Sequence, residues 1–207
     1  MTKIRMIYAY FLYKYNTKME DKMQITVHGT TITLEGKELK VGKEAPAARI
    51  TKLDGTQNVI GMIAPNSQLI VVIPSLKTEV CSLGAKKFND LVKNLKKLDT
   101  IIVTTDDIES VKKFIENESI DNAEIVIDTN RQFAKKFGLL IPEGKLKDRL
   151  ARAVFVIDRE GMIAYKEIVS EVVNEVNYDA CIAAIEKIAN DSKGAGHGHS
   201  HENWMGV

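Results

Sequence analysis

The chain has 207 residues, which is enough for one good hydrophobic core or two small ones, and we expect one. Its content of 44% hydrophobic and 28% charged residues excludes wholesale disorder, and no apolar run approaches the roughly 18 residues of a membrane-spanning helix. With 29 Lys and Arg against 28 Asp and Glu, the formal charge of +1 gives no electrostatic reason to expect nucleic acid as a partner.

Cysteine and histidine usage narrows the chemistry further. The two cysteines, Cys81 and Cys181, are too few for a disulfide framework, so a reducing cytoplasm is the expected compartment. Three of the four histidines fall within 197–201, which leaves only His28 in the part expected to fold. A Cys-His or Ser-His pair would have to use that one residue, and a zinc site would be short of ligands. We therefore predict neither a metal site nor a cofactor.

We divide the chain into an N-terminal extension (1–22), one domain (23–190) and a flexible tail (191–207). The extension is basic and rich in tyrosine. It can be interpreted as a signal peptide, as a membrane-surface anchor, or as a disordered or non-native segment ahead of a start at Met19 or Met23; the last is preferred. The tail is rich in Gly and His, and its alternating imidazoles fit either metal binding or an unstructured tract, so no site is assigned there.

The domain begins with alternating residues at 24–29 and 30–34, which predict a hairpin around a glycine-containing turn. The continuous apolar run 69–73 predicts a strand that is covered on both faces. Further strands are predicted at 49–53, 100–105, 124–127, 153–157 and 163–169, the last two as a hairpin.

Helices alternate with these strands. The spacing of Phe88, Leu91, Val92, Leu95 and Leu98 by three and four residues predicts an amphipathic helix after the buried strand. Three more helices are predicted: one capped by Asp106 or Asp107 and running through Asn117, a short one at 130–137 closed by Gly138, and a last one at 178–189. The alternation, with the closing hairpin, predicts an α/β layer fold around a mixed sheet.

The junction between the buried strand and the following helix carries the most informative residues. In α/β proteins, sites form at the carboxyl ends of strands. Thr78 suits the N-cap of the helix, which places Cys81 in its first turn. Unpaired N–H groups and the helix dipole favour a thiolate there without any histidine. The alternative is that Cys81 is a small buried hydrophobe, the more frequent situation for a lone cysteine. Because no C-x-x-C motif is present, a dithiol reductase is not expected.

Three motifs in order carry a family resemblance. Pro74-Ser75-x-x-Thr78-x-Val80-Cys81, followed by Lys87-Phe88-Asn89, resembles the peroxidatic-cysteine loop of the peroxiredoxins, most closely the bacterial thiol peroxidase subfamily. The segments 26–36 and 150–158 are similar to its N-terminal hairpin and its arginine-bearing strand. The resemblance extends from residue 24 to about 188 and implies a thioredoxin-like fold, with a central mixed sheet, flanking helices and an N-terminal β-hairpin.

The resemblance also implies an activity and residue roles. Cys81 would reduce hydrogen peroxide and organic hydroperoxides and become a sulfenic acid. Arg152 would stabilise the thiolate and the developing negative charge, the Thr78 hydroxyl would bridge thiolate and peroxide, and Pro74 would shield the sulfur. A surface salt bridge is the weaker interpretation of Arg152, which we place in mid-strand. The implied partners are a hydroperoxide, thioredoxin or another thiol reductant, and a second copy of the chain in a homodimer.

The sequence departs from the family pattern in its recycling chemistry. The subfamily usually carries a resolving cysteine at the position of Ile115, and isoleucine cannot form that disulfide. Cys181 lies on the apolar face of the last helix, where core packing is the expected role, so an external thiol is the preferred reductant. Lys77 and Glu79 replace the family's usual residues, with opposing effects on the thiolate. Two alternative functions stay open: a redox sensor or binding protein without efficient turnover, and metal handling through residues 197–201.

Overall fold

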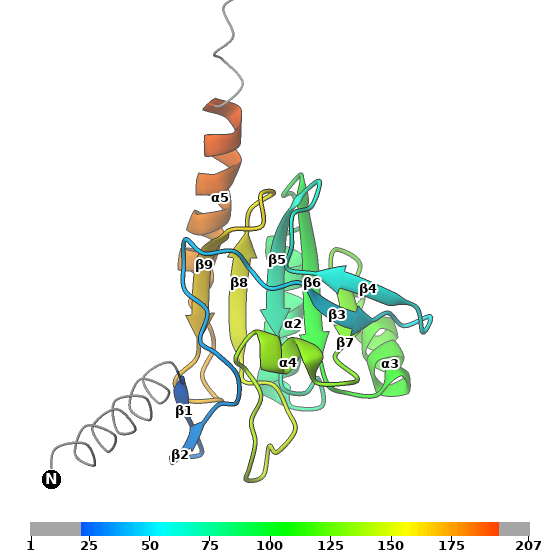
Figure 1. The fold of residues 1–207 in the computed structure, drawn as a ribbon. Coiled ribbons are helices and arrows are strands. Elements are labelled where there is room, and N and C mark those ends of the chain that lie inside the picture. The colour runs from blue at the N-terminus through cyan, green and yellow to red at the C-terminus, as the bar shows by residue number, and fades with distance from the viewer. Residues whose placement is uncertain (1–21, 195–207) are drawn as a thin grey trace, which may run out of the picture.

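The computed structural model describes residues 22–194; the extension before residue 22 and the histidines of the tail lie outside them. A seven-stranded sheet with the order β4-β3-β7-β6-β5-β8-β9 forms its centre (Figure 1). The strands are β3 (Ala48–Thr51), β4 (Gln57–Ile60), β5 (Ser67–Val72), β6 (Leu98–Thr104), β7 (Glu124–Ile127), β8 (Ala153–Ile157) and β9 (Ile163–Ile168). Strands β5, β6 and β7 are parallel to one another, and the outer strands pair antiparallel, so the predicted mixed sheet is confirmed.

Helices cover both faces of the sheet. The far face in Figure 1 packs on α2 (Glu79–Leu91), α3 (Ile108–Glu118) and α5 (Tyr178–Gly194). The near face packs on the short α4 (Gln132–Lys136) and on the hairpin of β1 (Gln24–Val27) and β2 (Thr30–Thr33). The central strand β5 is apolar throughout its inner part because it has a core on each side. The predicted layers and the N-terminal hairpin are therefore confirmed.

The hairpin is tied to the segment that follows β9. The N–H of Thr26 donates to the carbonyl of Ser170 at 2.6 Å, and the N–H of Val172 donates back to the carbonyl of Thr26 at 3.0 Å. The Glu171 carboxylate accepts from the backbone N–H groups of His28 and Gly29, at 3.0 and 3.1 Å. Both turn residues have positive φ, which is the geometry of a tight hairpin turn. The first strands of the domain thus fix residues 170–172 in place.

Helix α2 is shorter than its apolar spacing predicts. It ends at Leu91, and Leu98 belongs to β6 instead. Val92 is buried and Leu95 half-buried, so the apolar positions continue to pack although the backbone has left the helix. Lys97 adopts a left-handed φ of 59°, which reverses the chain and allows the strand to begin. Beyond Leu91, the spacing of the apolar residues therefore reflects packing on the sheet and not a helix.

Two further elements, β4 and α5, differ from the sequence-based predictions. Strand β4 was not predicted, because its first three residues are exposed at the edge of the sheet and carry no alternating apolar pattern. Helix α5 continues to Gly194, so the predicted end at 189 and the start of the tail at 191 both fall inside it. No helix within residues 22–194 is both long enough and apolar enough to cross a membrane.

Candidate active site

Cys81 lies in the first turn of α2, just after the carboxyl end of β5, and only 3% of it is exposed. Thr78 is the N-cap residue, as predicted, with an extended backbone at φ −99° and ψ 144°. Its side chain makes no cap hydrogen bond; the hydroxyl donates to the carbonyl of Ser75 at 3.4 Å instead. The first helical N–H groups have no partner within the helix, so they surround the thiol with partial positive charge.

Arg152 brings a full positive charge to the same sulfur. Its Nη2 atom donates to Sγ of Cys81 at 3.2 Å, and its Nε atom donates to the carbonyl of Val172 at 3.1 Å. The side chain is only 6% exposed, so the interpretation as a surface salt bridge is wrong. Arg152 also lies directly before β8 rather than in mid-strand. Because Ala153 pairs with Val72, β8 delivers the arginine to the end of β5 from which the Cys81 loop departs.

Pro74 and Ser75 begin the loop that connects β5 to α2. Pro74 is buried, and its carbonyl accepts from the hydroxyl of Thr105 at 3.5 Å. Proline has no backbone N–H, so this position offers no donor that would need a partner. The structure therefore brings Pro74 and Thr78, on the connection, close to Cys81 in the first turn of α2, and Arg152 faces the sulfur from the position just before β8.

Asp106 is an important residue of this region that the sequence did not reveal. It was considered as a helix cap, but Asp107 has that role and accepts from the N–H of Ser110 at 2.8 Å. Asp106 is buried, and its carboxylate accepts from the N–H of Leu76 at 2.6 Å and from the hydroxyl of Ser75 at 2.9 Å. The one sequence feature that could have indicated this contact is an aspartate directly after a buried strand.

The Lys87-Phe88-Asn89 motif packs α2 against its neighbours. The Phe88 ring lies 4.9 Å from the ring of Tyr178, centroid to centroid. The Oδ1 atom of Asn89 accepts from the N–H groups of Asp121 and Asn122 at 3.1 and 2.8 Å, which fixes the loop before β7. This motif thus contributes packing and loop anchoring, about two helical turns beyond Cys81.

Gly84 lies on the side of α2 that faces Arg152 and Tyr178. A Cβ atom at this position would lie 3.4 Å from the hydroxyl of Tyr178 and 3.7 Å from Nη1 of Arg152. The adjoining cavity, lined by Gly84, Phe88, Arg152 and Tyr178 among others, measures about 10 Å³. That is room for about one water molecule. The cavity beside Arg152 therefore holds little solvent, and Cys81, which does not line it, is itself buried.

The second cysteine is placed differently. Cys181 is fully buried on α5, and desolvation, with a smaller effect of the Glu167 carboxylate, raises the pKa of its thiol to about 12. Both cysteines are free thiols. Ile115, at the position where the resemblance places a resolving cysteine, is half-buried on α3 and packs against the far-face core.

Lys77, in the loop before Cys81, forms an exposed ion pair with Asp107 at 3.2 Å, so its charge is directed to that carboxylate.

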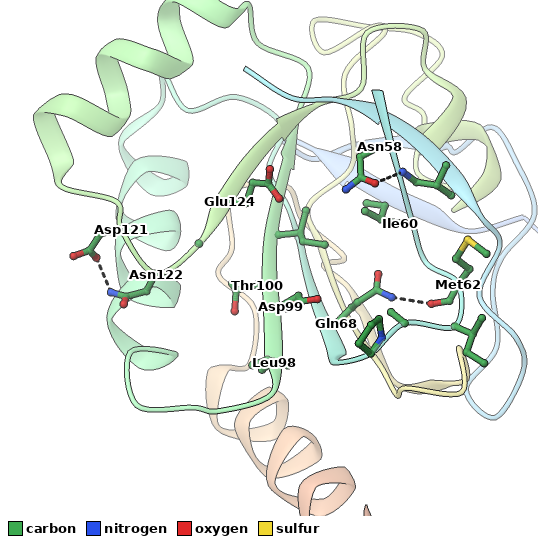
Figure 2. Close-up of a pocket in the computed structure, with 16 residues that line it drawn as sticks. Asn58, Ile60, Met62, Gln68, Leu98, Asp99, Thr100, Asp121, Asn122 and Glu124 are labelled. Carbon is green, nitrogen blue, oxygen red and sulfur yellow. Dashed lines mark hydrogen bonds between the residues drawn. The ribbon is translucent and has the colours of Figure 1, made fainter. Parts of the chain in front are cut away.

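A second hollow, much larger than the cavity beside Arg152, lies at the other end of the sheet (Figure 2). Its volume is about 680 Å³, and its lining includes Gln68, Leu98 and Glu124, which stand at the amino ends of β5, β6 and β7. Cys81 follows the carboxyl end of β5, so this hollow does not contain the thiol. Figure 2 shows the hydrogen bond that Gln68 donates to the carbonyl of Met62, which measures 2.8 Å. Among the described residues, no group of three or more His, Cys, Asp or Glu side chains could hold a metal ion.

Comparisons with known proteins identify the family. The Redoxin family model matches residues 40–182, most of the described domain. The chain is 37% identical to a thiol peroxidase of Aquifex aeolicus over 79% of its length and 97% of the relative's. It is 37% identical to a thiol peroxidase of Campylobacter jejuni over 72% of its length and 84% of the relative's. The chain therefore belongs to the Redoxin family.

Solved structures lead to the same class. A peroxiredoxin-like protein from Aquifex aeolicus superimposes with a TM-score of 0.78 at 36% identity, over 81% of this chain and 98% of that one. A thiol peroxidase from Chromobacterium violaceum, at 18% identity, superimposes with a TM-score of 0.72 over 83% of this chain and 98% of that one, and supports the fold alone. The thioredoxin-like fold is confirmed. Within the Redoxin family, the relatives define this chain as a thiol-dependent peroxidase of the peroxiredoxin type.

Proposed function

We propose that Cys81 is the peroxidatic residue and that it reduces hydrogen peroxide and organic hydroperoxides. The observation that carries this proposal is the 3.2 Å contact between Nη2 of Arg152 and Sγ of Cys81 in a buried site. The thiolate sulfur attacks the terminal oxygen of the peroxide, a new S–O bond forms, and the O–O bond breaks. The alkoxide or hydroxide leaves with the electron pair and takes a proton from water, and Cys81 becomes a sulfenic acid.

Each neighbouring residue has a role in that step. The Arg152 guanidinium, held by the Val172 carbonyl, favours the thiolate and stabilises negative charge as the O–O bond lengthens. The Thr78 hydroxyl, at the start of α2, donates to and accepts from the bound peroxide. Pro74 keeps one side of the sulfur free of backbone donors and water. These three roles follow from position and chemistry, and each is tested by substitution.

We propose that an external thiol such as thioredoxin recycles the enzyme. Its thiolate attacks the sulfur of the Cys81 sulfenic acid, the S–O bond breaks, and hydroxide leaves and takes a proton from solvent to form water; the mixed disulfide that results is reduced by a second thiol. Ile115 offers no sulfur, and Cys181 is fully buried with a raised pKa, so neither is suited to resolve Cys81. Because Cys81 is only 3% exposed, the first turn of α2 has to move before a second thiol can reach the sulfur.

We further propose that the enzyme acts in the cytoplasm as a homodimer. The use of two free cysteines fits a reducing compartment, and the exposed apolar side chains of Leu83 and Val173 offer surface to a second copy. Sedimentation equilibrium of the purified chain tests the dimer, and cell fractionation tests the compartment. The comparisons give no support to the alternatives of a sensor without turnover or a metal-handling protein.

The deciding experiment follows peroxide consumption by the purified protein, supplied either with thioredoxin and its reductase or with dithiothreitol. We expect repeated turnover with both reductants, lost in Cys81→Ser and kept in Cys181→Ser. If Cys181→Ser stops only the thioredoxin-driven turnover, Cys181 resolves Cys81 and the recycling proposal is wrong. A single stoichiometric oxidation with no turnover under either reductant would overturn the peroxidase and favour a sensor.

A further inference from the structure

A single segment carries two buried or half-buried arginines that face different parts of the site. Arg152 contacts the sulfur of Cys81, whereas Nη1 of Arg149 lies 2.7 Å from Oδ1 of Asp106. The segment between them is fixed to the chain around residue 140: the N–H of Ala151 donates to the carbonyl of Leu139 at 2.8 Å. The backbone between the two arginines is therefore anchored to the neighbouring segment.

The Asp106 carboxylate is the acceptor for the loop that precedes Cys81. Its Oδ1 atom accepts from the Ser75 hydroxyl and from Arg149, and its Oδ2 atom accepts from the N–H of Leu76 and, at 3.3 Å, from the hydroxyl of Thr104. Both oxygens thus hold the loop, and both are fully partnered. The Asp106 side chain is only 1% exposed, so these donors and the cation of Arg149 replace the water that it would contact on the surface.

We propose that Asp106 and Arg149 form a positioning pair that sets where the loop 74–78 and the start of α2 stand relative to Arg152. This inference rests on the proposed function of Cys81, since it concerns the geometry of the same reaction. The pair links the loop on one side of the sulfur to the segment that carries Arg152 on the other. The hydrogen bonds of the pair go to the loop and to residues 104 and 105 and not to the sulfur, so its members act through Cys81, Thr78 and Arg152.

The local contacts show why a cation is needed at Arg149. Besides Asp106, its Nη1 atom donates to the hydroxyl of Thr105 at 3.2 Å, and Thr105 in turn donates to the carbonyl of Pro74. The arginine side chain is one-third exposed, so its replacement disturbs the core little. Loss of the cation leaves a buried carboxylate without its counter-charge, and the loop donors lose their fixed acceptor geometry. An error of about 1 Å in such a site costs up to about a hundredfold in rate.

The test compares Arg149→Met, Arg149→Lys and the wild type. The lysine ammonium keeps the charge and a donor for Asp106, so it is the conservative variant. The matched control is Lys86→Met, which removes the 2.7 Å ion pair between Lys86 on α2 and Glu118 on α3 without touching the loop. Three quantities are measured for each: the rate constant for oxidation of Cys81 by hydrogen peroxide, the ultraviolet titration of the Cys81 thiolate, and the thermal unfolding midpoint.

We expect Arg149→Met to lower the oxidation rate constant by about tenfold and to shift the thiolate titration, with Arg149→Lys recovering most of the loss. Lys86→Met keeps the wild-type rate. Equal rates for Arg149→Met and the wild type would overturn the inference, as would a loss that Arg149→Lys does not relieve or that Lys86→Met shares.

The variant Ser75→Ala provides a second probe if Arg149→Met does not fold, because it removes only one hydroxyl from the same carboxylate. We expect a smaller slowing in the same direction, and a wild-type rate would overturn the inference. Failure of the proposed function would give a different result from failure of this inference. The wild-type protein itself would then show no oxidation of Cys81, and no variant would need to be compared.

Discussion

Arg152 donates a hydrogen bond to the sulfur of Cys81 across 3.2 Å, although 71 residues separate them in the chain. The pairing of Val72 with Ala153 between β5 and β8 accounts for this, because it places the end of one strand beside the beginning of the other. A slip of one residue in that register would turn the arginine to the opposite face of the sheet. The reactive pair is therefore specified by strand pairing as much as by the residues themselves.

The arginine should be difficult to replace. We expect Arg152→Met to lower kcat/KM for hydrogen peroxide by about a hundredfold or more, because it removes a fixed donor at the site of developing charge. Arg152→Lys should recover only part, since one ammonium cannot reach both the sulfur and the Val172 carbonyl as a guanidinium does. Arg49→Met, at an exposed position on β3, is the control. A fully active Arg152→Met enzyme would remove this residue from the mechanism.

Substitution of Thr78 should distinguish a role in catalysis from a role in helix capping. Its hydroxyl makes no cap hydrogen bond, so Thr78→Val should leave the thermal unfolding midpoint close to that of the wild type. The same change should slow Cys81 oxidation by about tenfold or more, because it removes a donor and acceptor for the peroxide. Thr78→Ser keeps the hydroxyl and should keep the rate. Rapid-quench kinetics give the rate and calorimetry the midpoint; a normal rate in Thr78→Val would contradict the role.

Asn89 is expected to matter for stability. Asn89→Ala leaves the N–H groups of Asp121 and Asn122 without their acceptor and should lower the free energy of unfolding by about 2 kcal/mol. Urea denaturation measures this loss of free energy, provided that the dependence of the free energy on urea concentration is the same in both proteins. Asn94→Ala, at an exposed position beyond the end of α2, should change the free energy by less than about 0.5 kcal/mol. Equal effects of the two changes would show that the loop before β7 does not depend on Asn89.

The buried Cys181 thiol predicts a loss of stability in alkali. Its pKa is raised from an ordinary value of 9.0 to about 12, so its contribution is fully present below pH 9 and is lost as the pH rises toward 12. The unfolded thiol ionises in this window and the folded one does not. Between about pH 8 and about pH 10.5 the wild type should lose about 2 kcal/mol more than Cys181→Ala. Parallel losses in the two proteins, measured by urea denaturation, would contradict this.

The sequence predicted the structure best where a residue pattern has a single structural explanation. The apolar run of β5, the cysteine after it and the motif order led to the sheet, the thiol and the family. Periodicity misled where packing continued beyond the helix, as at Leu95 and Leu98. The polar edge strand β4 has no apolar pattern by which it could be found.

The contacts of Asp106 and Arg149 depend on tertiary structure and could not be read from the chain. The two residues are 43 positions apart, and neither has a neighbour in sequence that indicates its partner. Arg152 was recognised through its motif, but its partners, the Val172 carbonyl and the Cys81 sulfur, became visible only in the folded chain.

The hairpin of β1 and β2 limits how far the protein can be truncated at its N-terminus. The Redoxin match begins at residue 40, so a protein trimmed to that match would keep Cys81, Thr78 and Arg152. It would lack Thr26, whose backbone is bonded to both Ser170 and Val172, and with it the brace behind the carbonyl that holds Arg152. The region that the family model matches is therefore smaller than the region that must be expressed together to obtain an ordered site.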